Sequence, residues 1–427
     1  MAVRFIDLFA GIGGIRKGFE QACFEQNLDC ECVFTSEIKP YAVEVLKQNH
    51  PNEKIYGDIT TINEHSIPDF DFLLGGFPCQ AFSVAGKRLG FTDTRGTLFF
   101  DVERIIKTKK PFGFILENVE GLVSHDKESK TDKIGRTLKT ILQHLDDLGY
   151  HTNWKVLNAK DFAVPQERKR VYIVGTRKDT VNLNNFTTKT KLLSEILLSG
   201  LPTVKSNFIT QLLEKYPAET LYGKAVKDKR GGDNNIHSWD IGIKGDISED
   251  EKSLLNAILK ERRKKRWAEE FGIDWMDGMP LTTEQIRTFS NIPSLQQVLD
   301  KLESIGYLKL EHPKKRVGGK RVQDTSLPLG YNIVTGKMSF EVNKILDPNA
   351  FAPTLVAMDM KGLFVVDGKG IRNLSLFEGL QMFGYPEDYK FDVSIDDGYD
   401  LLGNTVVVPV IREVSKRVLE IYKLEVS

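Results

Sequence analysis

The chain has 427 residues, of which 41% are hydrophobic and 28% are charged, so it can bury a core and is not an intrinsically disordered polymer. Its 59 basic residues balance its 59 acidic residues, and a neutral total does not exclude a nucleic-acid partner, because local clusters of charge decide such binding. A chain of this length favours two domains.

The N-terminal stretch and the cysteines favour a cytoplasmic protein. Residues 1–14, MAVRFIDLFAGIGG, lack the basic and apolar regions of a signal peptide, and no apolar run reaches the roughly 18 residues that span a bilayer. The 4 cysteines do not form a disulfide framework. Cys30 and Cys32, without further cysteine or histidine partners, make a poor zinc site, so we expect no metal and a reducing compartment.

The first part of the chain alternates between strand-like and helix-like segments. Residues 4–20 are typical of a strand, a glycine turn and a helix, and residues 32–38 and 40–50 predict a second strand and helix. Further elements are predicted as strands at residues 70–76, 112–119, 151–159 and 170–177 and as a helix at residues 135–149. This alternation predicts parallel pairing in a doubly wound α/β domain over residues 1–178.

Residues 179–345 have a different character, because they lack the strand–helix alternation and contain basic, polar stretches. Residues 280–289 and 294–308 predict two helices, and residues 309–323 predict a basic hairpin. That order is similar to a winged helix-turn-helix, in which the second helix or the wing meets DNA. The alternative is a small helical insert with a solvated basic face, and the sequence leaves both open.

From about residue 350 the regular pattern returns. Residues 362–368 predict a hairpin strand, residues 372–384 a helix, and residues 400–424 a polar turn followed by an amphipathic helix. The last helix needs a sheet to pack on, and the N-terminal sheet is the available one. We therefore expect residues 346–427 to return to the first domain and complete it.

The turn DLFAGIGG follows the first predicted strand and opens a helix. Gly11, Gly13 and Gly14, with Phe9 just before them, let the backbone come close to a ligand. The spacing G-x-G-G departs from the G-x-G-x-x-G of nicotinamide dinucleotide folds. A purely structural tight turn is the alternative.

Two acids follow predicted strands at the edge where open α/β sheets bind ligands. Glu37 stands where an acid accepts hydrogen bonds from ribose hydroxyls, and Asp58 could accept one from an adenine amino group. Their negative charge also suits a cationic sulfonium cofactor. Each acid alone is more often a solvated loop residue.

The loop GGFPCQAFSVAGKRLGF carries Cys79 directly after Pro78, at the same predicted edge. A free thiol has a pKa of about 8.5 and needs a helix start or neighbouring cations to act as a nucleophile. Glu117, in ENV, and Arg168 and Arg170, in QERKR, are expected at this edge as well. A thiol beside a carboxyl and two arginines indicates covalent catalysis with proton transfer.

Together these blocks resemble the cytosine-C5 DNA methyltransferases, most closely the bacterial restriction-modification type. The blocks stand in the family's order: DLFAGIGG, Glu37, GDI, the Pro78–Cys79 loop, ENV, QERKR, RNLSLFEGLQMFGYP and GNTVVVPV. They cover residues 1–178 and about 350–427, and residues 179–345 stand where this family carries its variable target-recognition domain.

The resemblance implies a Rossmann-like fold that binds S-adenosylmethionine and acts on double-stranded DNA. It also implies a monomer in the bacterial cytoplasm, associated with the nucleoid when bound to DNA, and a cognate restriction endonuclease that shares its short specific site. The cofactor-lining positions that it implies are Phe9, Gly11, Gly13, Gly14, Glu37, Asp58, Ile59, Pro78, Leu98 and Asn404.

The resemblance further implies catalytic roles. Cys79 would attack C6 of a flipped-out cytosine, and Glu117 would hydrogen-bond N3 and the exocyclic amine. Arg170 would contact the base carbonyl, and Arg168 would help to hold the geometry of the site. C5 would take the methyl group before the C5 proton and the cysteine leave. A mobile loop closing over the DNA would carry Gln80, Ser83, Lys87, Arg88 and Arg95.

Three alternatives differ from this interpretation. An RNA cytosine-5 methyltransferase uses the same thiol chemistry, but the long basic middle segment favours duplex DNA. A catalytically silent DNA-binding regulator would not need the intact set of Pro78, Cys79, Glu117, Arg168 and Arg170. A nicotinamide-dependent dehydrogenase fails on the glycine spacing. The recognition sequence is not readable, and the GGDNN loop at 231–235 and the basic hairpin are candidates for base contacts.

Overall fold

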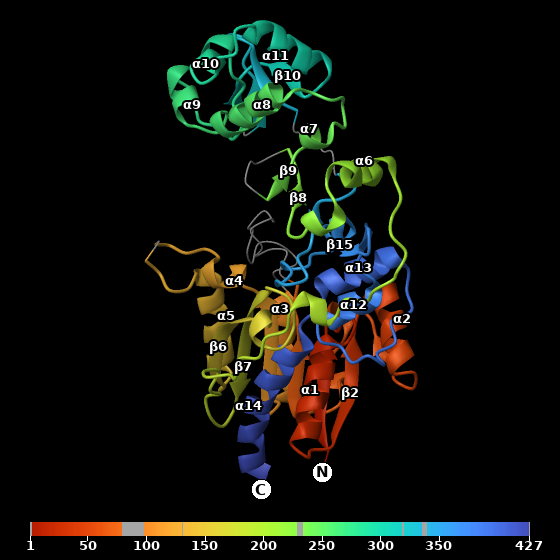
Figure 1. Cartoon of the computed structure of the whole chain (residues 1–427). Coiled ribbons are helices and arrows are strands. Elements are labelled where there is room, and N and C mark those ends of the chain that lie inside the picture. Colours follow the sequence, from red (N-terminus) through yellow and green to blue (C-terminus); the bar gives the residue numbers. More distant parts are fainter. Residues whose placement is uncertain are drawn as a thin grey trace. The chain divides into compact units, whose positions relative to one another are not determined.

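A computed structural model of the chain describes residues 2–78, 98–129, 131–228, 234–317, 320–334 and 340–426. The chain forms two compact units (Figure 1). Unit 1 comprises Met1–Leu198, Pro348–Met360 and Ser375–Ser427, and unit 2 comprises Ser199–Asp347 and Lys361–Leu374. The described part of the chain holds no helix that is both long and apolar enough to cross a lipid bilayer.

Unit 1 is built on a seven-stranded sheet of order β3-β2-β1-β4-β5-β7-β6. The strands are β1 (Val3–Leu8), β2 (Cys30–Ser36), β3 (Ile55–Tyr56), β4 (Phe72–Gly75), β5 (Gly113–Val119), β6 (His151–Asn158) and β7 (Lys169–Thr176). β1 pairs in parallel with both β2 and β4, so the order of the strands reverses at this point. Such a switch point is where open α/β sheets bind ligands.

The prediction of parallel pairing is correct for β1 to β5 and wrong for the last two strands. β7 runs antiparallel to both β5 and β6. No α-helix lies between β6 and β7, and the connection is too short for a parallel crossover. The antiparallel hairpin brings Arg168 and Arg170 back beside the end of β5, because Arg170 pairs in register with Val119.

Helices cover the sheet, which explains why its central strands are apolar on both faces. They are α1 (Gly14–Glu25), α2 (Pro40–Asn49), α3 (Leu98–Lys109), α4 (Gly121–Ser124), α5 (Arg136–Asp147), α12 (Leu376–Gln381), α13 (Ile395–Asn404) and α14 (Val408–Val426). α14 lies against α1 (Figure 1). A Cβ added to Gly18 would come within 2.6 Å of Ile411 Cβ, so this glycine allows the two helices to approach closely.

The C-terminal helix also reaches the sheet itself. The rings of Phe72 in β4 and Tyr422 in α14 have centroids 5.2 Å apart. The second face of the sheet packs on α3 and α5 through a core that includes Leu73, Phe99 and Ile141. The first and last parts of the chain therefore share one hydrophobic core.

Unit 2 contains a five-stranded sheet of order β16-β15-β14-β8-β9. Its strands are β8 (Ala225–Val226), β9 (Asn235–Ile236), β14 (Lys344–Ile345), β15 (Leu363–Asp367) and β16 (Gly370–Asn373). The sequence boundaries place residues 361–374 with the returning segment, but β15 pairs with β14 in this sheet. Residues 179–198, conversely, belong to unit 1. The pairing of β15 with β14 decides the first difference, and hydrogen bonds from Leu193 N to Ala350 O and from Ser194 N to Pro348 O tie the second segment to unit 1.

The rest of unit 2 is mostly helical. Its helices are α6 (Asn207–Lys215), α7 (Ser238–Ile241), α8 (Glu249–Glu261), α9 (Arg266–Glu270), α10 (Thr283–Arg287) and α11 (Leu295–Ser304). Four strands follow: β10 (Leu308–Glu311), β11 (Lys314–Val317), β12 (Lys320–Gln323) and β13 (Gly330–Ile333). β11 and β12 form the predicted basic hairpin.

Candidate active site

A cavity of about 400 Å³ opens in unit 1 where β1, β2, β4 and β5 end. It therefore lies at the switch point of the sheet. The cavity brings together many of the residues singled out from the sequence: Phe9, Gly11, Glu37, Asp58, Ile59, Pro78, Leu98, Glu117, Arg168, Arg170 and Asn404. The parallel strands β1 to β5 deliver most of these residues to one edge, Arg168 and Arg170 lie at the start of the antiparallel strand β7, and Asn404 lies at the end of α13.

The predicted nucleophile is not among the described residues. Cys79 lies outside them, as do the loop residues Gln80, Ser83, Lys87, Arg88 and Arg95. The described residues that flank this stretch, Pro78 and Leu98, both line the cavity.

Gly13 and Gly14 do not line the cavity, unlike the other predicted cofactor positions. Gly13 has φ 72° and precedes α1. A Cβ added to Gly14 would lie 2.6 Å from Tyr385 Oη and 2.8 Å from Val406 Cγ2. Gly14 thus makes room for the C-terminal segment of the chain.

The start of the glycine turn has a left-handed backbone. Phe9 and Gly11 both have φ 55°. This conformation is unusual for phenylalanine, and such strain is concentrated at functional sites. The strand is thereby turned sharply where it enters the cavity.

Glu37 holds the backbone that surrounds it. Its Oε2 accepts a hydrogen bond from Gly11 N at 2.7 Å, and its Oε1 accepts from the N–H groups of Ile38 and Lys39, each at 2.8 Å. A carboxylate offers about four acceptor positions, so one remains for a ligand hydroxyl. The acid therefore both shapes the turn and faces the cavity.

Asp58 caps the short 3-10 helix at Ile59–Thr61. Its Oδ1 accepts from Thr60 N at 2.9 Å and from Thr60 Oγ1 at 2.8 Å. Oδ2 accepts no hydrogen bond from any described residue, which leaves one carboxylate oxygen open for a donor such as an exocyclic amine.

Glu117 and Arg170 form an ion pair at the other side of the cavity. Arg170 Nε lies 3.1 Å from Glu117 Oε1, without the alignment of a hydrogen bond. Burial raises the pKa of Glu117, while the charges of Arg170 and Arg168 act in the opposite direction. The carboxyl therefore holds a proton more readily than an exposed glutamate does, and its oxygen remains open to a ligand.

Arg168 is 3% exposed and binds main-chain oxygens. Nη1 donates to Leu355 O at 2.8 Å, and Nη2 donates to Thr405 O at 2.9 Å and to Gly403 O at 3.3 Å. Its guanidinium also lies 5.2 Å from the centre of the Phe383 ring. Arg168 therefore ties the C-terminal segments to the edge of the sheet that borders the cavity.

The family model described as C-5 cytosine-specific DNA methylase matches residues 3–420. The chain belongs to this family. The methylase is accordingly an enzyme that methylates C5 of cytosine in DNA, with S-adenosylmethionine as the methyl donor.

Several type II methyltransferases are similar to this methylase over nearly its whole length. M.NlaIV of Neisseria lactamica is 66% identical over 98% of this chain and 99% of its own. M.NgoBV of Neisseria gonorrhoeae is 65% identical over the same shares. M.BanI of Aneurinibacillus aneurinilyticus is 41% identical over 97% of this chain and 95% of its own.

Solved structures share the fold of the methylase. The Entamoeba histolytica methyltransferase EhMeth aligns with a TM-score of 0.54 at 14% identity, over 99% of each chain. A putative DNA modification methyltransferase encoded within an E. coli prophage also has a TM-score of 0.54, at 19% identity, over 99% of this chain and 100% of that one. The prediction of a Rossmann-like methyltransferase fold is confirmed.

Asn118 is a site residue whose role the motif ENV did not reveal. It is 2% exposed and lines the cavity of the methylase, and its Nδ2 donates to Phe77 O at 3.1 Å. This bond joins the end of β5 to the residue two positions before Cys79. Asn118 thus holds the backbone of Phe77, shortly before the predicted nucleophile.

Lys39 and Asp400 are further residues of the site that no motif indicates. Lys39 lines the cavity, and its Nζ donates to Asp400 Oδ2 at 2.7 Å, as does Tyr41 Oη at 2.6 Å. Asn404 Nδ2 donates to Asp400 O at 2.8 Å, which orients a side chain that lines the cavity. A contact between residues so far apart in the sequence leaves no local pattern.

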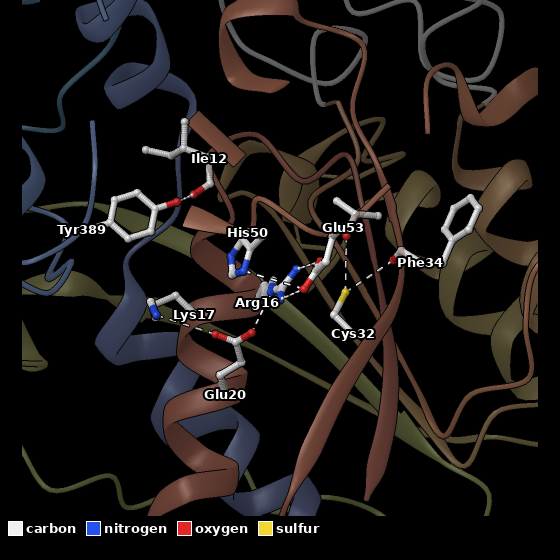
Figure 2. Close-up of polar contacts among 10 residues, drawn as sticks. Ile12, Arg16, Lys17, Glu20, Cys32, Phe34, His50, Glu53 and Tyr389 are labelled. Carbon is white, nitrogen blue, oxygen red and sulfur yellow. Dashed lines mark hydrogen bonds and ion pairs between the residues drawn. The ribbon is translucent and has the colours of Figure 1, made fainter. Parts of the chain in front are cut away.

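Arg16, on the helix that follows the glycine turn, is bound by two carboxylates (Figure 2). Its Nε donates to Glu20 Oε1 at 2.7 Å, and Nη2 donates to Glu53 Oε1 at 2.6 Å. Tyr389 donates to the carbonyl of Ile12. These contacts anchor the turn of the methylase from outside the cavity.

Asp7, on β1, is fully buried, and its two carboxylate oxygens accept no hydrogen bond from the described residues. Burial raises its pKa to about 8, and the charge of Arg16 opposes that shift. Burial therefore favours the protonated form of this carboxyl.

Proposed function

We propose that Cys79, Glu117, Arg168 and Arg170 carry out methyl transfer at a cytosine that is flipped out of a short specific site in duplex DNA. We further propose that this methylation protects host DNA from a cognate restriction endonuclease. Support comes from the type II methyltransferases that match the chain over nearly its whole length. The protein would act as a monomer on nucleoid DNA in the bacterial cytoplasm.

The observation that carries the catalytic assignment is that Pro78, Glu117 and Arg170 line one cavity. Cys79 follows Pro78 directly in the chain, and we propose that its sulfur attacks a base that lies between these residues. A base inside a duplex is out of reach, and flipping costs about a few kcal/mol. The cations of the cavity can offset part of that cost by binding polar atoms of the base.

Addition of the Cys79 thiolate to C6 would place negative charge on the pyrimidine ring. Glu117 can stabilise that charge, because its raised pKa favours a proton that it would donate to N3. Its second oxygen would accept a hydrogen bond from the exocyclic amine, and Arg170 would bind the base carbonyl. Once C5 carries the methyl group, loss of the C5 proton to water, return of the N3 proton to Glu117 and departure of the sulfur from C6 would restore the aromatic ring.

S-adenosylmethionine, when bound, supplies the electrophilic methyl group, and the residues present fit it. The remaining acceptor position of Glu37 suits a ribose hydroxyl, and the open Oδ2 of Asp58 suits the adenine amine. The two carboxylates also favour the sulfonium charge. The sharp turn at Phe9 and Gly11 brings backbone close to this end of the cavity.

Trapping on 5-fluorocytosine tests the assignment, because the fluorine at C5 cannot leave as the proton does. In a duplex that the protein methylates, 5-fluorocytosine replaces the target cytosine. We expect a covalent complex joined through Cys79, and peptide mass spectrometry locates the modified residue. Cys79→Ala should abolish the adduct, and Cys30→Ala should retain it. No adduct, or an adduct through another sulfur, would overturn the mechanism, and methylation of transfer RNA alone would favour the RNA enzyme.

A further inference from the structure

The helical part of unit 2 has the connectivity of a winged helix. After α8, Leu281 pairs in antiparallel fashion with Tyr331 of β13, and β10 pairs antiparallel with the other edge of β13. α10 and α11 lie between Leu281 and β10, in the positions of a helix-turn-helix (Figure 1). All these elements share one core that includes Ile258, Ile286 and Leu299.

The β11–β12 hairpin is the wing of this module, and its base is firmly held. Glu311, at the end of β10, accepts a hydrogen bond from Asn332 Nδ2 at 2.6 Å, and Arg262 Nη1 donates to Asn332 Oδ1 at 2.6 Å. Asp324 N donates to Pro313 O at 2.8 Å and closes the hairpin. These buried contacts fix the direction in which the wing leaves the module.

The wing carries like charges directly opposite one another. Arg316 of β11 is in register with Arg321 of β12, and both are exposed. Among the described residues, neither arginine has an ion-pair partner. Like charges in this position destabilise a strand pair, so the arrangement costs stability in the free protein. An anionic ligand between the two guanidinium groups would relieve the repulsion.

The same face of the wing borders an open hollow of about 260 Å³. It is lined by Lys314, Arg316, Arg321, Asp274 and Trp275, and of its three cations Lys314 also lies 3.8 Å from Glu311 Oε2. Trp275 is 42% exposed, which leaves part of its ring open to a ligand. The guanidinium group of an arginine presents a fork of N–H donors that matches two oxygens of a phosphate.

Helix α11 is a poor alternative for a contact with phosphate. Its exposed side includes Asp300 and Glu303, and Lys301 is bound to Glu251 at 2.6 Å. These acids would repel a DNA backbone. The charges of the module therefore favour the wing over the helix that occupies the recognition position.

We propose that the wing binds the sugar–phosphate backbone of duplex DNA through Lys314, Arg316 and Arg321, and that this contact adds sequence-independent affinity to the methylase. The inference rests on the proposed function, because it takes duplex DNA as the polyanion that the enzyme must hold. It assigns the wing a holding role and leaves base reading to other residues of unit 2.

Binding of the full-length protein to a short duplex, measured at several salt concentrations, tests the inference. Between about 50 and 200 mM salt, Arg316→Gln/Arg321→Gln should bind roughly 10-fold more weakly, with a log–log salt slope smaller by about 2. Lys252→Gln/Lys260→Gln, which removes two charges from α8 of the same module, should match the wild type. Arg316→Lys/Arg321→Lys should keep most of the affinity.

Unchanged affinity and slope in the arginine variant would overturn the inference, and so would an equal loss in the α8 control. A loss confined to an RNA hairpin would assign the wing to RNA instead. If the double variant does not fold, Arg316→Gln alone removes the repulsion, and its slope should fall by about 1. Methyl transfer by the wild-type enzyme to plasmid DNA is measured in parallel. If the wild type transfers no methyl groups, the proposed function is contradicted. If it transfers them and the arginine variants still bind DNA as the wild type does, only the role of the wing is contradicted.

Discussion

Arg168 Nη2 donates a hydrogen bond to the main-chain oxygen of Thr405, 237 positions further along the chain. With the bonds to Leu355 O and Gly403 O, this side chain joins three segments of unit 1 at the edge of the cavity. A residue taken from the sequence as catalytic thus acts on the fold as well. Replacement of Arg168 should therefore lower the free energy of unfolding, whatever it does to the activity.

Arg168→Met should lower the free energy of unfolding by about 2–4 kcal/mol, because buried carbonyls lose a charged donor. Urea unfolding measures the change. Arg177→Met, at an exposed arginine just after β7, should stay within about 0.5 kcal/mol of the wild type. A similarly small effect at Arg168 would show that its hydrogen bonds do not hold the C-terminal segments.

Glu117→Gln should reduce methyl transfer by about 10²–10⁴-fold, because the amide cannot supply the proton of a carboxyl. Glu120→Gln, at an exposed neighbour, should transfer methyl groups at the wild-type rate. Single-turnover transfer from labelled cofactor separates the two variants. An active Glu117→Gln enzyme would remove this residue from the mechanism.

The stability of the Glu117→Gln variant should also depend on pH differently from that of the wild type. The pKa of Glu117 is raised from 4.5 by burial, so the folded state binds the proton more tightly than the unfolded state. This contribution to stability is complete below the ordinary pKa and is lost as pH rises through the raised one. The stability of Glu117→Gln relative to the wild type should therefore increase from acidic to neutral pH, as urea unfolding at each pH would show.

Asp58→Asn and Glu37→Gln should both weaken cofactor binding, by roughly 10-fold, but only the second should destabilise the fold by about 1–2 kcal/mol. In the Asp58→Asn variant, the amide oxygen can still accept the hydrogen bonds from Thr60, so the 3-10 helix keeps its cap. In the Glu37→Gln variant, a single amide oxygen must serve the three N–H groups that the carboxylate binds.

Isothermal titration gives the cofactor affinities of the Asp58 and Glu37 variants, and urea unfolding gives their stabilities. Equal destabilisation by both changes would contradict the separate roles of the two acids.

Gly14→Ala should lower stability by about 1–3 kcal/mol, because its methyl group would meet Tyr385 and Val406. The affinity of the folded variant for the cofactor should not change. Gly11→Ala is the matched comparison: its methyl group meets nothing within 4 Å, but φ 55° disfavours alanine by about 1–2 kcal/mol. If the Gly14→Ala protein is fully stable but binds the cofactor more weakly, Gly14 has the cofactor-binding role that was expected from the sequence.

The raised pKa of Asp7 predicts a second effect of pH on the stability of the fold. Its folded pKa of about 8 lies far above its ordinary 3.8, so its contribution to stability is complete below about pH 4 and declines as pH rises to about 8. Asp7→Asn should flatten the fall in stability over this range, whereas Asp69→Asn, at an exposed carboxyl, should leave it unchanged. Identical slopes in all three proteins would show that Asp7 is ionised in the fold.

Much of the site could be predicted because its residues stand in short blocks that follow strands. Parallel strands bring such blocks to one edge whatever lies between them, so Glu37, Asp58 and Glu117 meet in one cavity, which Asn404 also lines from the end of α13. The partners of these residues could not be predicted in the same way. The contact between Lys39 and Asp400 joins positions 361 apart and has no local pattern.

The sequence by itself determined the family, the α/β class and the identity of the proposed catalytic groups, because periodicity and motif chemistry are local properties of a chain. Only the tertiary structure decided that β7 runs antiparallel, that the β15–β16 hairpin belongs to unit 2, and that Gly14 faces Tyr385. Each of these depends on which distant surfaces meet, and that is settled by strand pairing and close packing over the whole chain.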